Sequence, residues 1–330
     1  MPLNPYHGLW SRLEDFDPRE LGQLMLDRKV VRIVVMRGTI HLVSAADCLL
    51  LRPLMQPVLD AELARHPKYG PALEGVDIEA VLSFARPLLA ERARSGRELR
   101  AAMTERFPQH NAAALAYACR NLLAFVQVPP RGVWGKTAQV TSTTAESWLG
   151  RPLVGEPSID DVVLRYLRAF GPATVADIAS WSRLTGMRAV VDRLAPRLRT
   201  FRDARGRMLF DLPDAPRPDP GTPAPPRFLP EYDNVLLSHA DRSRFASPTH
   251  RSHRTPPPAI HGTVLSDGVV CATWRIDRDK AGRKATLFVD QVAELTRGAA
   301  AAVAAEGRRL VRFLSDGAVC ADEVRFTRAG

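Results

Sequence analysis

An Arg-Gly pair lies between two strand-like runs at three places in the chain, and helical segments precede each pair. Arg37-Gly38 separates an apolar run at 34–36 from an alternating run at 39–43. Arg131-Gly132 and Arg205-Gly206 stand in similar settings. Glycine accepts the positive φ angle that a short turn between strands requires. The three pairs therefore predict three β-hairpins, each ending a repeated unit.

Helical periodicity fills the segments before and after these hairpins. Asp17, Pro18 and Glu20 form a helix start before the first hairpin, and residues 4–13 form an earlier helix with Asn4 as its cap. Capping-box patterns predict further helix starts at Ser44 with Asp47, at Ser95, at Thr143 with Glu146, and at Thr174 with Asp177. The helices expected before the second and third hairpins are 77–90, 95–107, 111–124, 158–170, 174–184 and 185–198.

Three helices followed by a hairpin form the winged-helix arrangement, in which the third helix can enter a DNA groove while the hairpin, or wing, touches the backbone. We therefore predict an α+β fold with three tandem winged-helix units and then a small β-rich, barrel-like module. The first unit lacks the leading helix that the other two have, so it is either degenerate or incomplete at its start. The expected segments are 1–70, 71–150 and 151–213 for the three units, 214–230 for a Pro-rich linker, and 231–330 for the β-rich module.

The β-rich module is predicted from a second kind of turn. Asp267-Gly268 lies between two apolar runs, which is a strong hairpin signal. Residues 284–289 form an expected strand, residues 292–310 a helix, and residues 309–314 a possible last strand.

Charge and composition indicate which kinds of binding partner and which compartment suit this chain. The net charge is +10 and arginine supplies most of the basic residues, which suits phosphate binding because a guanidinium group can pair two oxygens. Compositional bias in an Arg-, Ala- and Pro-rich chain is an equally good explanation of the charge. No run reaches the roughly 20 apolar residues of a membrane span, and no signal peptide is visible. The four scattered cysteines form no zinc ribbon or disulfide framework, so a cytoplasmic protein is expected.

Arginines at the hairpin turns are the first candidates for contacts to double-stranded DNA. A solvated turn is the alternative for any one hairpin, but three pairs at the same place in a repeat favour DNA. A second basic stretch, bordered by prolines, is either a phosphate-tracking loop or a solvated surface loop. The candidate DNA-binding residues are Arg37, Arg131, Arg205, Arg242, Arg244, Arg251 and Arg254.

Three polar residues are candidates for a cleft. His41 alternates with apolar neighbours in the first hairpin and faces either a nucleic-acid cleft or the strand's own surroundings. Asp233 could stabilise a cationic sugar-like transition state, whereas Asp233-Asn234 equally suits an Asx-turn, which we favour. Trp134 is a lone tryptophan, so we expect it to pack in the core and not to stack on a base. Metal binding at His250 and His253 lacks a third ligand, so neither a metal nor a cofactor is expected.

Three stretches of sequence add to the architectural resemblance to a known family. RGTIHLV at 37–43, VQVPPRGVWG at 126–135 and LPEYDNVLLSHADRSR at 229–244 resemble the winged-helix proteins that include the AlkZ and YcaQ DNA glycosylases. The resemblance runs from about Asn4 to the C-terminal strands. It implies tandem winged helices in a concave scaffold, a C-terminal β-barrel, and action on alkylated or crosslinked DNA bases.

The resemblance also implies a catalytic Gln-x-Gln or Gln-x-Asp pair just ahead of the segment that reads PLNPYHGLW here. That pair is absent because the chain starts at Met1, so no catalytic residue is assigned. We expect the reading frame to continue upstream and to encode the pair. The extended protein should then release an alkylated base, and the 330-residue form should bind DNA with little or no turnover.

Two function classes remain open from the sequence. One is a DNA glycosylase-like repair protein, and the other is a non-catalytic DNA-binding protein or transcriptional regulator. Regulators usually match a dimer's symmetry to two half-sites, which three unlike tandem units in one chain do not supply. We therefore favour the repair protein, as a monomer with no obligate protein partner.

Overall fold

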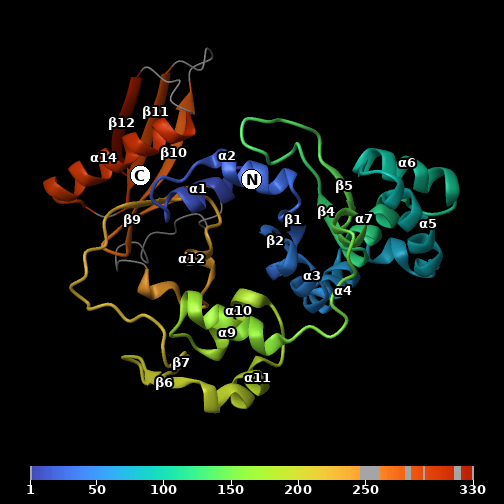
Figure 1. The fold of residues 1–330 in the computed structure, drawn as a ribbon, viewed down its shortest axis with the longest axis horizontal. Coiled ribbons are helices and arrows are strands. Elements are labelled where there is room, and N and C mark those ends of the chain that lie inside the picture. The colour runs from blue at the N-terminus through green and yellow to red at the C-terminus, as the bar shows by residue number, and fades with distance from the viewer. Residues whose placement is uncertain (1, 246–260, 279–283, 293, 316–320, 329–330) are drawn as a thin grey trace. The chain divides into compact units, whose positions relative to one another are not determined.

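The computed structural model describes residues 2–245, 261–278, 284–292, 294–315 and 321–328 (Figure 1). The chain forms two compact units, one made of residues 17–213 and the other of residues 3–16 together with 214–330. Each contains its own sheet and helices, so the fold is a mixed α+β architecture.

A five-stranded sheet organises the first part of the 17–213 unit. Its strand order is β2-β1-β4-β5-β3, with β1 antiparallel to both β2 and β4. The first two predicted hairpins thus belong to one sheet, although the repeat in the sequence predicts that they belong to separate units. Ile33 and Val126 are buried where β1 meets β4. The strands are β1 (Val30–Val34), β2 (Ile40–Ser44), β3 (Arg94–Ser95), β4 (Phe125–Gln127) and β5 (Thr141–Thr144).

Most helices around this sheet begin at the capping residues that the sequence predicts. Asp17 accepts a hydrogen bond from Arg19 N, and Ser95 forms a complete capping box with Glu98. The cap expected at Thr143 is wrong by one residue: Thr144 caps the helix, while the Thr143 hydroxyl donates to Leu89 O. These helices are α2 (Pro18–Leu26), α3 (Ala45–Leu54), α4 (Gln56–Arg65), α5 (Ile78–Glu91), α6 (Gly96–Arg106), α7 (Ala112–Leu122) and α8 (Ala145–Leu149).

Three helices and a separate hairpin complete this unit (Figure 1). Thr174 and Asp177 form the predicted capping box. Tyr166 and Trp181 are buried with their ring centroids 4.9 Å apart, and Ala173 pairs with Phe210, which ties the hairpin to the helices. The elements are α9 (Ile159–Phe170), α10 (Val175–Ser182), α11 (Met187–Leu194), β6 (Arg199–Arg202) and β7 (Met208–Asp211).

An open five-stranded sheet with α14 on one face forms the other unit (Figure 1). Its order is β12-β11-β10-β9-β8, and Trp10 of α1 stacks on Phe313 of α14. Gly307 allows α14 to lie close to the sheet, because a Cβ atom there would lie 2.7 Å from Leu287. The elements are α1 (Asn4–Trp10), β8 (Arg227–Leu229), α12 (Asn234–Leu237), β9 (Gly262–Ser266), β10 (Val269–Arg278), β11 (Lys284–Gln291), α14 (Arg297–Leu314) and β12 (Ala321–Arg328).

The hairpin predicted at Asp267-Gly268 is confirmed as β9–β10, and both turn residues have positive φ. Two other expectations for this unit are wrong. The sheet is not a barrel in the described part of the chain, since β8 and β12 stand at opposite edges. Residues 309–314 continue α14 instead of forming a strand, because Leu310 and Val311 share the buried helix face with Val303.

Candidate nucleic-acid interface

The third Arg-Gly hairpin presents an exposed turn between β6 and β7. Asp203 organises this turn, since its Oδ1 accepts hydrogen bonds from Arg205 N at 2.9 Å and from Arg207 N at 2.8 Å. Gly206 has φ +76°, and a Cβ atom there would meet nothing within 4 Å. The predicted hairpin is confirmed, and the Arg205 side chain at its turn is exposed. A phosphate backbone can approach this turn without steric obstruction at Gly206.

Exposed arginines extend from this turn to α11. Arg193 pairs with Asp160, and Arg207 with Asp203, so some of this charge is balanced within the unit. Arginines outnumber aspartates over residues 187–211, which leaves an excess of positive charge for phosphate contacts. The exposed arginines of this region are Arg188, Arg193, Arg197, Arg199, Arg202, Arg205 and Arg207.

The first Arg-Gly turn is confirmed as a hairpin turn but is packed against α10. Nη1 of Arg37 donates to Trp181 O at 3.1 Å, and Nη2 lies 3.1 Å from His41 Nε2. Arg183 in turn donates to Arg37 O at 3.4 Å. A Cβ atom on Gly38 would lie 2.6 Å from Oε2 of Glu62. Arg37 therefore joins two elements of the protein, which reduces its availability to a phosphate.

His41 is half-buried on β2 beside Arg37. Its Nδ1 lies 2.9 Å from Thr39 O. Burial lowers the pKa of His41 to about 4; the Thr39 carbonyl opposes this shift, and the positive charge of Arg37 adds to it. The ring is therefore neutral at physiological pH and suits a hydrogen-bonding role better than a phosphate contact.

The second Arg-Gly pair lies in a long loop at 128–140 between β4 and β5, not in a tight turn. The Arg131 guanidinium donates to Ala138 O at 3.0 Å within this loop. Gly132 has φ +86°, and a Cβ atom there would lie 2.9 Å from the Arg32 side chain. Trp134 is half-buried, so it is not one of the fully buried core residues. The Arg131 side chain thus makes its hydrogen bond within the loop itself.

Asp233 and Asn234 begin the short helix α12 in the other unit. Asp233 is 6% exposed, and its Oδ1 accepts hydrogen bonds from Val235 N at 2.9 Å and from Arg12 Nη2 at 2.7 Å. Asn234 is exposed. This is the geometry of an N-cap, and the ion pair adds a link between α12 and the segment after α1. Arg12 was missed from the sequence because its partner lies over 200 positions away.

The basic stretch after α12 is only partly described. Arg242 and Arg244 are exposed in a short 3-10 turn that Asp241 caps through Ser243 N. Both side chains are accessible to solvent and to a charged partner. Arg251, Arg254, His250 and His253 lie outside the described residues.

His7 on α1 is a polar group that the sequence analysis missed. Its Nε2 is buried without a hydrogen-bond partner among the described residues, and its ring centroid lies 6.2 Å from that of Trp274. Burial, and secondarily the charge of Arg278, lower its pKa to about 4. The imidazole is therefore neutral at physiological pH and a weak base, and one histidine on a helix gives no sequence signal for such burial.

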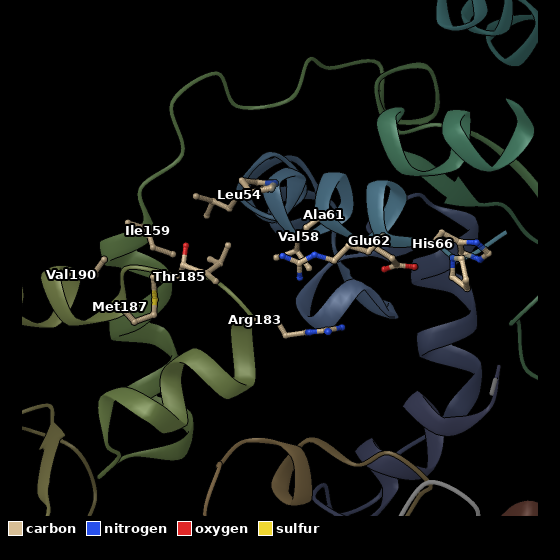
Figure 2. A pocket seen from close by; sticks show the side chains of 14 residues that line it. Leu54, Val58, Ala61, Glu62, His66, Ile159, Arg183, Thr185, Met187 and Val190 are labelled. Carbon is tan, nitrogen blue, oxygen red and sulfur yellow. The ribbon is translucent and has the colours of Figure 1, made fainter. Parts of the chain in front are cut away.

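A hollow of about 700 Å³ lies in the 17–213 unit between α4 and the start of α11 (Figure 2). Glu62, His66 and Arg183 add polar groups to it, and Glu62 Oε1 accepts a hydrogen bond from the Tyr117 hydroxyl at 2.8 Å. The sequence did not indicate this hollow, because periodicity does not show which faces of helices far apart in the chain lie against each other. Its apolar walls include Leu54, Val58, Ala61, Ile159, Met187 and Val190.

The described residues form neither a cluster suited to a metal ion nor a helix suited to a membrane. No group of three or more histidine, cysteine, aspartate or glutamate side chains gathers there in a way that could hold a metal ion. In the same part of the chain, the helices are too short or too polar to cross a membrane.

Comparisons with known proteins agree with the architecture. A family model described as DNA glycosylase AlkZ-like matches residues 2–313. The solved structure of the Streptomyces sahachiroi DNA glycosylase AlkZ is similar, with a TM-score of 0.69 over 94% of this chain and 85% of that chain. The sequence identity is 21%, so this likeness concerns the fold. The comparison with curated proteins gives no match.

Proposed function

Because this chain belongs to the DNA glycosylase AlkZ-like family, whose model spans residues 2–313, we propose that it is a DNA glycosylase-like repair protein. Its substrate class is double-stranded DNA that carries alkylated or crosslinked bases. The family match is the observation that carries this proposal. In the reaction, water adds to the sugar carbon and passes one proton to solvent, while the bond to the base breaks and the base leaves with the bonding electron pair.

The proposal includes winged-helix units. The order α5, β3, α6, α7, β4, β5 has the helices and hairpin of one such unit, and α9, α10, α11 with β6–β7 has those of another. In the second of these, α11 corresponds to the helix that enters a groove and β6–β7 to the wing. The exposed arginines on both elements support this assignment.

Contacts to phosphate form the DNA-binding part of the proposal. Arg205 is the leading candidate because its hairpin turn is exposed, and Arg242 and Arg244 are further candidates. Arg37 and Arg131 contribute less, since each donates to a backbone carbonyl within the protein. Arg251 and Arg254 remain candidates on the sequence alone.

Asp233 contributes to the fold of the site more than to the reaction. Its carboxylate already accepts hydrogen bonds from Val235 N and Arg12, so stabilising a cationic sugar would cost these two contacts. His7 is not a better candidate for a proton acceptor, because its Nε2 is buried and a pKa of about 4 makes its imidazole a weak base.

Base release tests the proposal directly. The protein is incubated with a duplex that carries alkylated purines, and the free base is separated and measured by chromatography. A matched undamaged duplex is the control. We expect the form that carries the glutamine pair described above to release the base from the alkylated duplex only, and the 330-residue form to bind that duplex with little or no release. Tight binding without base release by the form that carries the pair would contradict the glycosylase interpretation and favour a non-catalytic DNA-binding protein.

Salt dependence tests the binding part separately. Each phosphate that an arginine neutralises should change the slope of log affinity against log salt by about 0.9. Charge reversal of Arg37, Arg131 and Arg205 together should therefore weaken binding on any sequence. Equal affinity of this triple variant and the parent at moderate salt would contradict contact through the hairpins.

A further inference from the structure

Tyr232 is an exposed aromatic side chain in the segment between β8 and α12. Its exposed fraction is 55%, whereas every other tyrosine, tryptophan or phenylalanine of the described residues is buried or half-buried. Its ring makes no hydrogen bond or ring contact with another described residue. Aromatic rings normally stabilise a protein by burial, so the core gains nothing from this one.

The backbone of Tyr232 adopts an unusual conformation for such a residue. Its φ is +57°, in the left-handed region that glycine and asparagine adopt readily and bulky side chains avoid. Glycine at this position would fold with less strain. Strained positions persist where the surrounding structure holds them, and they concentrate at functional sites.

Contacts on both sides of Tyr232 hold that conformation. Before it, Leu229 O accepts a hydrogen bond from Trp274 Nε1 at 2.9 Å, and Glu231 O accepts one from Asn4 Nδ2 at 2.7 Å. After it, the buried Asp233 carboxylate accepts from Val235 N and pairs with Arg12. The ring is therefore exposed to solvent on a backbone that these contacts hold, so little backbone entropy is lost when it meets a ligand.

We propose that Tyr232 stacks on an unpaired or extruded base of damaged DNA, an inference that rests on the proposed repair function. An exposed aromatic ring offers a planar apolar face, which every base can match with its own face regardless of sequence. A repair enzyme that exposes its target base leaves such a face uncovered. Tyr232 is then a binding residue that distinguishes damaged from intact duplex, separate from the arginines that contact phosphate.

Three variants of the full chain test this inference. Tyr232→Gly removes the ring and relieves the backbone strain, Tyr232→Phe keeps the ring, and Leu13→Ala is a control for an exposed apolar side chain (52% exposed) in the same unit. The probes are a fully paired duplex and the same duplex with one unpaired adenine. Affinities are measured by fluorescence anisotropy at several salt concentrations, and melting temperatures are recorded.

We expect Tyr232→Gly to bind the duplex with the unpaired adenine between about fivefold and 150-fold more weakly, the range for one base stacked on an aromatic ring. Its affinity for the paired duplex, its salt slope and its melting temperature should stay close to those of the parent. Tyr232→Phe and Leu13→Ala should retain both affinities.

Two results would overturn the inference while leaving the proposed function intact. One is an unchanged affinity of Tyr232→Gly for the unpaired adenine, and the other is an equal loss on both duplexes, which would indicate a contact to backbone. Failure of the parent to bind either duplex would instead overturn the proposed function together with the inference.

Discussion

The first and third Arg-Gly hairpins have the same two residues at their turns and different surroundings. Arg37 is half-buried and donates to Trp181 O, whereas the Arg205 side chain is exposed. A side chain on Gly38 would collide with Glu62, but one on Gly206 would meet open space. The dipeptide thus suits the turn of both hairpins, and the neighbouring helices decide whether its arginine can meet a ligand.

The largest expected difference between the two hairpins is in pH dependence, because only the first has a histidine near its turn. The pKa of His41 is lowered to about 4 by burial, against an ordinary value of 6.5. Between these values the unfolded chain binds a proton that the folded chain does not, so stability is full above pH 6.5 and falls as the pH drops toward 4. A shift of this size corresponds to at most about 3 kcal/mol, and solvent near the half-buried ring reduces that.

Urea unfolding of the parent and of His41→Gln between pH 4 and 7 measures this effect. The variant should lose less stability over that range than the parent does. His7→Gln should behave in the same way for the other compact unit, since burial also lowers the pKa of His7 to about 4. Parallel pH profiles for the parent and His41→Gln would show that His41 does not couple to folding.

The second difference concerns the turn glycines. Gly38→Ala should lower the free energy of unfolding by about 2 kcal/mol, because alanine is strained at φ +68° and its methyl group displaces the Glu62 carboxylate from the Tyr117 hydroxyl. Gly206→Ala, at φ +76° with no neighbour within 4 Å, should cost about 1 kcal/mol from backbone strain alone. Chemical denaturation of both variants measures the two costs. Equal costs would mean that the packing around Gly38 is not what distinguishes the hairpins.

Local features of this fold follow from the sequence, and long-range ones do not. The caps at Asp17, Ser95 and Thr174 and the turns at Gly38 and Gly206 depend on residues a few positions apart, and the structure confirms them. A one-residue error at Thr143 reflects two adjacent threonines that both suit a cap.

The pairing of distant strands depends on contacts that periodicity does not encode. The shared sheet of β1 and β4 and the parallel pair β11–β12 are of this kind, and so the expected barrel was wrong. The contacts of the candidate site residues were likewise not predictable from local sequence patterns. The alternation around His41 did not reveal that Arg37 contacts α10, and nothing near Asp233 pointed to Arg12.

The smallest expected difference is in DNA binding by single charge reversals, and it bears most directly on function. Arg205→Glu should weaken duplex binding by about tenfold at moderate salt and lower the salt slope by about 0.9, because one phosphate contact is lost. Arg37→Glu should change the affinity less and should instead reduce stability, since it breaks the hydrogen bond to Trp181 O and places a carboxylate beside His41. Fluorescence anisotropy with one duplex, together with melting temperatures, separates the two effects. If Arg37→Glu weakens binding more than Arg205→Glu does while keeping the parent's melting temperature, then the packed turn, and not the exposed one, meets the DNA.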